Sequence, residues 1–188
     1  MDNPTIVLLF SGKRKSGKDF ICEKIRTILG DGTCTIVRIS EPLKGLYANH
    51  HGLDLQELLS DGPYKENYRS AMIKWSDEIR AKEPGYFCKA ACDMAKVKPV
   101  WIVSDIRRIT DVQWFKQTYQ SKIKMIRIHA DIEIRKSRGW VFTEGVDDAA
   151  SECNLDDFKN WDLEISNNND KQLESGIKEI MALINSVY

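Results

Sequence analysis

The chain has 188 residues, enough for one domain with a sizeable hydrophobic core, and nothing in its length requires a second domain. Its 28 Lys and Arg residues balance 28 Asp and Glu residues, which excludes a strongly basic nucleic-acid binder and an acidic interaction tail. The apolar run near the N-terminus, in MDNPTIVLLF, is too short for a signal peptide or a membrane span. We therefore expect a soluble protein of the cytosol, with any functional charge gathered locally. Because the connections are short and no exposed apolar stripe is evident, we also expect a monomer.

The predicted elements alternate between short apolar strands and amphipathic helices. A buried strand closed by Ser-Gly precedes the first helix, and Ser40-Glu41-Pro42 opens the second with proline in its first turn. Strands are predicted at 5–10, 33–39, 100–105, 123–129 and 162–166. Helices are predicted at 18–29, from 40, at 64–82, 86–95, 110–119 and 132–138, and from about 170 to 187. The order predicts an α/β fold with three layers (α/β/α) and a parallel five-stranded sheet covered on both faces.

Two stretches give no clear element. Residues 51–62 carry mixed signals, and 139–158 shows no regular period. The second is long for a connection inside a compact domain, which is typical of a functional loop or lid.

The cysteines and histidines form no metal-binding pattern. No C-x-x-C pair occurs, so we expect free thiols, as is typical of a reducing compartment. The histidines have no metal-ligand spacing with one another or with a cysteine, so we expect structural or surface roles for them. The residues concerned are Cys22, Cys34, Cys88, Cys92, Cys153, His50, His51 and His129.

The stretch FSGKRKSGKDF, residues 10–20, nearly matches the phosphate-binding loop (P-loop) pattern G-x-x-x-x-G-K-[ST], with Asp19 at the last position. It follows a predicted buried strand and opens a helix, so backbone N–H groups and the positive helix end point at the same place. The alternative is a solvated basic turn. We expect ATP phosphates to be bound here, by Gly12, Lys13, Arg14, Lys15, Ser16, Gly17, Lys18 and Asp19.

A second cluster, VSDIRRITD, lies at the end of the predicted third strand. Asp105 is placed where ATPases carry an aspartate that holds magnesium, usually through water. The guanidinium groups of Arg107 and Arg108 suit a phosphate or carboxylate. The alternative is a surface ion cluster in which these arginines pair with Asp105 or Asp111.

A third cluster, RKSRGW, puts Arg135 and Arg138 on one helical face beside the lid-like stretch. A lid arginine can neutralise charge on a transferred phosphoryl group. The alternative is an exposed basic helix end. The nearby acids could hold the lid open or pair with these arginines, and the sequence leaves both options open; they are Glu144, Asp147, Asp148 and Glu152.

Together, SGKRKSGKD, VSDIRR and RGWVFTEGVDDAASEC closely resemble the animal-type phosphomevalonate kinases, a family with the nucleoside monophosphate kinase-like P-loop fold. The resemblance also takes in EPLK, YK and PGYFC and runs over essentially the whole chain. It implies transfer of the ATP γ-phosphoryl group to (R)-5-phosphomevalonate, giving 5-diphosphomevalonate and ADP in the mevalonate route to isoprenoids and sterols. ATP would be the co-substrate and Mg²⁺ the cofactor.

The resemblance also implies roles by position. Lys18 would bridge to the transferred phosphoryl group, and the lid arginines Arg135 and Arg138 would act on the same group. Asn167 would line the nucleotide pocket. The family carries the aspartate at position 19, so Asp19 and Asp105 are the candidate Mg²⁺ ligands. Acceptor-binding residues would be Lys65, Arg69, Arg80, Arg107 and Arg108. The domain plan would be one P-loop kinase domain, 1–188, with an acceptor-binding helical region at about 41–98 and a lid at about 135–158.

The sequence leaves two other functions open. A nucleoside monophosphate kinase would share the ATP-binding half, although the many cations on the acceptor side favour a smaller, strongly anionic substrate. The second is a nucleotide-binding regulator without turnover. In such a protein, Asp19 in place of Ser or Thr would mean that the magnesium site has been lost. The sequence shows no obvious catalytic His or Glu, which agrees with a phosphate acceptor that is already ionised at neutral pH.

Overall fold

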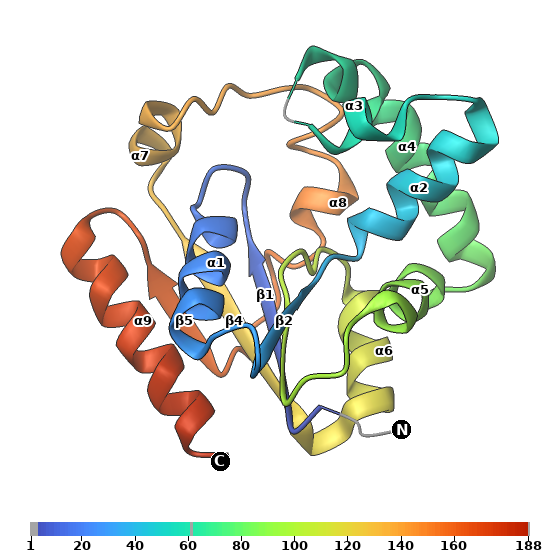
Figure 1. Ribbon diagram of the computed structural model, residues 1–188. Coiled ribbons are helices and arrows are strands. Elements are labelled where there is room, and N and C mark those ends of the chain that lie inside the picture. The colour runs from blue at the N-terminus through green and yellow to red at the C-terminus, as the bar shows by residue number, and fades with distance from the viewer. Residues whose placement is uncertain (1–3, 61, 188) are drawn as a thin grey trace.

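The computed structural model describes residues 4–60 and 62–187, so the predicted domain limits at 1 and 188 lie outside the described residues. A parallel sheet of five strands forms the centre, in the order β2-β3-β1-β4-β5 (Figure 1). This confirms the predicted fold class. The strands are β1 (Ile6–Gly12), β2 (Cys34–Val37), β3 (Val100–Val103), β4 (Ile123–His129) and β5 (Leu163–Ser166).

Helices cover both faces of the sheet, with α1 and α9 on one face and α5 and α6 on the other (Figure 1). The described helices are α1 (Lys18–Leu29), α2 (Ser40–His51), α3 (Leu55–Leu59), α4 (Pro63–Lys82), α5 (Tyr86–Met94), α6 (Ile109–Tyr119), α7 (Ile132–Ser137), α8 (Ala150–Cys153) and α9 (Asp170–Asn185), with a 3₁₀ turn, η1 (Gln120–Lys122). None of the helices in the described ranges is long and apolar enough to cross a membrane.

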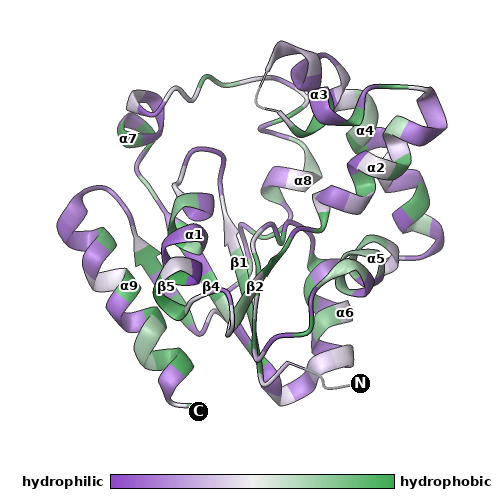
Figure 2. Cartoon of the chain, viewed as in Figure 1, coloured by the Kyte–Doolittle hydropathy of each residue, from purple (hydrophilic) through white to green (hydrophobic). Residues whose placement is uncertain are grey.

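The central strand β1 explains why the sheet forms. Alternate residues of this strand enter the two hydrophobic layers: Leu8 packs with α1 and α9, and Leu9 packs with α5 and α6. Both side chains are fully buried, and each such burial contributes about 1.5–3 kcal/mol. Apolar residues are accordingly concentrated in the strands, and polar residues on the outer helix faces (Figure 2).

A separate hydrophobic cluster joins α2, α3 and α4 beside the carboxyl ends of the strands (Figure 1). Its buried members include Tyr47, Leu58 and Met72. The signals at residues 51–62 were mixed because α3 has only five residues. Its N-cap Asp54 accepts hydrogen bonds from two backbone N–H groups.

The ends of the predicted strands and helices differ from the observed ones by up to two residues, and two differences are instructive. β2 ends at Val37 because the next residues leave the sheet: the N–H groups of Ile39 and Ser40 donate to Asp105 instead. The lid stretch 139–158, expected as a loop, contains the four-residue helix α8, which is too short to show a helical period. The chain leaving α7 runs across toward α3 and α4 before it returns to α8 (Figure 1).

Candidate active site

A cleft of about 760 Å³ opens at the carboxyl ends of the strands, between the P-loop, α2, α4 and the turn after β3. It lies where parallel α/β sheets bind ligands. The cleft brings together the P-loop residues 12–19, Asp105 and the five cations expected on the acceptor side. Three of the predicted residues do not line it: Arg135, Arg138 and Asn167.

The backbone of the P-loop requires glycine at two positions. A Cβ on Gly12 would lie 2.7 Å from Oγ of Ser16 and 2.8 Å from the carbonyl oxygen of Ile128. Gly17 has φ +87°, a left-handed conformation that favours glycine, and it immediately precedes α1. The loop therefore turns tightly and points the start of α1 into the cleft, as a phosphate site requires.

Lys18 is the buried cation of the site, with a side chain only 7% exposed. Its Nζ donates to the carbonyl oxygen of Ser104, 2.5 Å away, and to Oδ1 of Asp19 at 2.7 Å. The lysine is thus held between the P-loop and the end of β3, at the base of the cleft.

Asp19 faces the cleft, with 77% of its side chain exposed. Partial burial tends to raise the pKa of this carboxyl group, but the charges of Lys18, Arg107 and Arg38 and the Lys18 hydrogen bond outweigh it, so the pKa lies below the ordinary 3.8. A carboxylate that stays ionised and open to solvent is a suitable hard ligand for Mg²⁺.

Asp105 is already engaged by the backbone. Its Oδ1 accepts the N–H of Ile39 at 2.7 Å, and its Oδ2 accepts the N–H of Ser40 at 2.9 Å. Each carboxylate oxygen has a second lone pair, so contact with a metal through water remains open to Asp105. Within the described ranges, no three His, Cys, Asp or Glu side chains gather as a metal site.

Each arginine on the acceptor side has a carboxylate partner. Arg107 pairs with Glu152 of α8, and Arg80 pairs with Asp111. Arg108 donates to Asp77 at 2.5 Å, and Arg69 pairs with Glu66 in the same helix. The sequence offered Asp105 or Asp111 as alternative partners of Arg107 and Arg108. The side chains of these arginines bond Glu152 and Asp77 instead. Their backbone N–H groups donate to Asp111.

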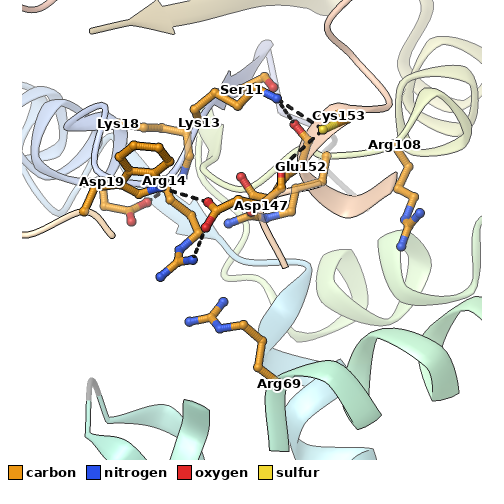
Figure 3. Close-up of polar contacts among 12 residues, drawn as sticks. Ser11, Lys13, Arg14, Lys18, Asp19, Arg69, Arg108, Asp147, Glu152 and Cys153 are labelled. Atoms are coloured by element: carbon orange, nitrogen blue, oxygen red, sulfur yellow. Dashed lines mark hydrogen bonds and ion pairs between the residues drawn. The ribbon is translucent and has the colours of Figure 1, made fainter. Parts of the chain in front are cut away.

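The lid stretch supplies acids to the P-loop cations (Figure 3). Lys13 Nζ lies 2.7 Å from the carbonyl oxygen of Glu152 and 2.6 Å from Oδ2 of Asp156. Arg14 donates to Asp147 at 2.8 Å. Of the acids whose partners the sequence left open, Asp147 and Glu152 therefore bond Arg14 and Arg107, not the lid arginines.

Arg138 and Asn167 lie against the back of the P-loop. Arg138 donates to the carbonyl oxygen of Ser16 at 3.1 Å and to that of Asn167 at 2.8 Å. The Asn167 side-chain amide donates to the same Ser16 oxygen at 2.9 Å. In this conformation, both residues hold the loop backbone from outside the cleft.

Arg135 also contacts the loop from behind. Its Nε donates to the carbonyl oxygen of Arg14 at 2.8 Å, and its guanidinium group lies 4.2 Å from the ring centroid of Trp140. Burial lowers the pKa of Arg135 from its ordinary value, although Asp147 opposes the shift. An arginine remains charged at neutral pH even so.

Sequence reasoning missed the buried charge of Arg127 and named Asp111 only as an alternative partner of the strand-end arginines. Arg127, in β4, is 7% exposed and donates to Oγ of Ser11 at 2.8 Å and to Asp156 at 3.0 Å. Asp111 is 1% exposed. The predicted strand 123–129 carries Arg127 among apolar residues, and a charge buried in a strand needs a partner, so this was the available signal.

A glycine-rich loop between β1 and α1, a buried lysine at its end and a facing wall of arginines define a P-loop kinase. The family model described as phosphomevalonate kinase matches residues 10–121. The chain is 47% identical to phosphomevalonate kinase of Drosophila melanogaster, over 93% of this chain and 94% of that protein. The chain belongs to the phosphomevalonate kinase family.

A solved structure is similar in fold. TT1252 from Thermus thermophilus superposes with a TM-score of 0.52 and 15% sequence identity, covering 96% of this chain and 98% of that one. At this identity the likeness concerns the fold alone.

Proposed function

We propose that this protein transfers the γ-phosphoryl group of ATP to the phosphate of (R)-5-phosphomevalonate, giving 5-diphosphomevalonate and ADP in the mevalonate route to isoprenoids and sterols. Membership of the family supports the substrate. The observation that carries the proposal is the shape of the cleft: the P-loop with Lys18 forms one wall, and Lys65, Arg69 and Arg80 lie on the wall contributed by α4. One cation set suits the donor and the other the acceptor.

The donor side would bind the ATP phosphates through the P-loop backbone and its cations. Lys18 Nζ would contact the phosphoryl group during transfer, since a positive charge held at that place stabilises the negative charge that develops on the group. Arg135 and Arg138 would contribute from the lid, and Asn167 would border the nucleotide site. Their hydrogen bonds to P-loop carbonyl groups support an action close to the phosphates.

A magnesium ion would accompany ATP and screen the phosphate charge. Asp19 fits a role as its ligand because its carboxylate is ionised and faces the cleft. Asp105 fits a contact through water, since its two oxygens already accept backbone N–H groups.

The acceptor side explains why the reaction needs many cations. Two unit charges about 4 Å apart repel by about 4 kcal/mol at an effective dielectric constant of 20, and the donor and acceptor both carry several. Arg107 and Arg108, with Lys65, Arg69 and Arg80 of α4, would offset this repulsion. A general base is unnecessary, because the acceptor phosphate is already ionised at neutral pH.

The proposed layout is one kinase domain, with an acceptor-binding helical region at about 41–98 and a lid at about 135–158 that closes over the substrates and excludes water. The protein would act as a monomer in the cytosol. The free thiols at all five cysteines are in keeping with a reducing compartment.

The test is a coupled ADP-release assay with ATP, Mg²⁺ and a panel of acceptors: phosphomevalonate, mevalonate, AMP, CMP and UMP. We expect turnover with phosphomevalonate and a rate at least about tenfold lower with each other acceptor, equivalent to ~1.4 kcal/mol of discrimination. Turnover with AMP and none with phosphomevalonate would overturn the proposal in favour of a nucleotide kinase. ATP binding without acceptor-dependent ADP release would indicate a regulator instead.

A further inference from the structure

One buried carboxylate, Asp111, connects three arginines of the acceptor wall. Its Oδ1 forms an ion pair with the guanidinium group of Arg80. Its Oδ2 accepts the backbone N–H of Arg108 at 3.1 Å and that of Arg107 at 3.4 Å. The side chain of Asp111 is 1% exposed, so these contacts are shielded from water.

Arg80 depends on this contact for its orientation. Its side chain is 11% exposed, and its guanidinium carbon lies 5.2 Å from the ring centroid of Phe87. Its Nε has no hydrogen-bond partner among the described residues. The ring restricts one face of the guanidinium group, and Asp111 is the carboxylate that fixes its direction within the plane.

The backbone contacts of Asp111 serve a different purpose. Asp111 is in the first turn of α6, and acceptance of the Arg108 N–H is an ordinary way to satisfy a free donor at a helix start. A neutral oxygen can accept that hydrogen bond, whereas the partner of Arg80 has to be negative to form an ion pair. A change from Asp to Asn therefore separates the two roles.

We propose that Asp111 is a positioning residue for the acceptor: it holds Arg80 pointed into the cleft and fixes the turn that carries Arg107 and Arg108. It acts through these arginines and does not itself touch the substrate. The proposal rests on the proposed function, because it takes this wall of the cleft as the acceptor site.

The first experiment is Asp111→Asn, with steady-state kinetics for both substrates. We expect KM for phosphomevalonate to rise at least tenfold, while KM for ATP changes less than twofold, because the P-loop is untouched. The matched control is Asp162→Asn. Asp162 also accepts a backbone N–H, from Met125 at 2.7 Å, but does not line the cleft; its substitution should leave both KM values within twofold.

A double-mutant cycle tests the route through Arg80. If Asp111 acts by orienting Arg80, then Asp111→Asn should add less than twofold to the KM for phosphomevalonate of Arg80→Gln. If the KM of the double variant rises by the product of the two single-variant increases, Asp111 acts independently of Arg80, and the proposal is overturned. An equal rise in both KM values in Asp111→Asn would indicate a general structural defect and overturn it too.

A measurement on the unaltered protein covers the case in which Asp111→Asn fails to fold. The ¹⁵N NMR signals of the Arg80 guanidinium group, assigned by their loss in Arg80→Gln, should show slow rotation about Cζ–Nε without any acceptor present. Fast rotation would mean that Arg80 is not held, and would refute the inference. Absence of phosphomevalonate turnover in the unaltered protein would refute the proposed function instead, so the two failures are distinguishable.

Discussion

Gly17 and Asn167 share a space that one methyl group would fill: a Cβ built on Gly17 would lie 2.2 Å from Nδ2 of Asn167. That amide nitrogen donates to the carbonyl oxygen of Ser16, at the centre of the P-loop. The shape of the phosphate-binding loop and the position of the residue behind it are therefore mutually dependent.

Gly17→Ala should weaken ATP binding at least about tenfold (~1.4 kcal/mol), because the new methyl group displaces Asn167 and releases the Ser16 carbonyl. Titration calorimetry with Mg-ATP measures this. Gly30→Ala is the matched control: Gly30 has a similar positive φ, +78°, but nothing lies within 4 Å of its Cβ position. Both variants should lose about 1–3 kcal/mol of stability from backbone strain, and equal ATP affinities in the two would contradict the argument.

Lys18→Met should lower kcat by about 10²–10³-fold, by removing the cation that would follow the transferred phosphoryl group. The near-equal length of methionine should preserve packing, so the far-UV circular dichroism should match the unaltered protein. Lys89→Met, at an exposed position of α5, is the control for loss of a lysine charge. Retention of more than a tenth of the activity in Lys18→Met would remove this lysine from the catalytic machinery.

Asp19→Ser tests the magnesium role of the carboxylate. We expect the Mg²⁺ concentration for half-maximal activity to rise about tenfold, since a charged hard ligand is replaced by a neutral hydroxyl group. Asp31→Ser changes an exposed carboxylate paired with Arg26 and should leave the Mg²⁺ dependence unaltered. If Asp19→Ser also leaves it unaltered, the carboxylate serves to position Lys18, to which it bonds at 2.7 Å.

The pKa of the Asp19 carboxyl group should depend on the positive charges around it. Its pKa in the folded protein should lie below 3.8, and it should rise in Lys18→Met as the main favourable charge is lost. Because the folded-state pKa is lowered, the stability that Asp19 contributes is fully present above pH 3.8 and is lost as the pH falls through the lowered value. Carboxyl ¹³C NMR titration measures both values, and a pKa at or above 3.8 in the unaltered protein would contradict this account.

Much of the fold was predictable because its signals are local. The strand 123–129 is predicted to the residue, and α1 begins and ends as its apolar spacing and the following Gly30 indicate. The errors lie where tertiary contacts decide. β2 stops early because Asp105, far along the chain, accepts the N–H groups of Ile39 and Ser40.

The residues of the site could be predicted from the sequence, but their ion-pair and hydrogen-bond partners could not. Sequence places Arg107 and Arg108 at a strand end, yet the partners of their side chains, Glu152 and Asp77, come from elements that no local pattern connects to them. Arg138 was expected to face the phosphates, and its contacts with P-loop carbonyl oxygens could not be inferred, because they depend on how α7 meets the loop. Its catalytic role remains a prediction.

The carboxylates of the lid stretch that pair with cations of the cleft should change how strongly salt affects substrate binding. Lys13, Arg14 and Arg107 already hold carboxylates from residues 147–156, so these sites of the free protein are close to neutral. A phosphate that reaches these cations would exchange with a carboxylate instead of displacing loosely held counterions. Under the proposed function, affinity for ATP and for the acceptor should therefore fall less steeply with ionic strength than the number of cations around the cleft would suggest.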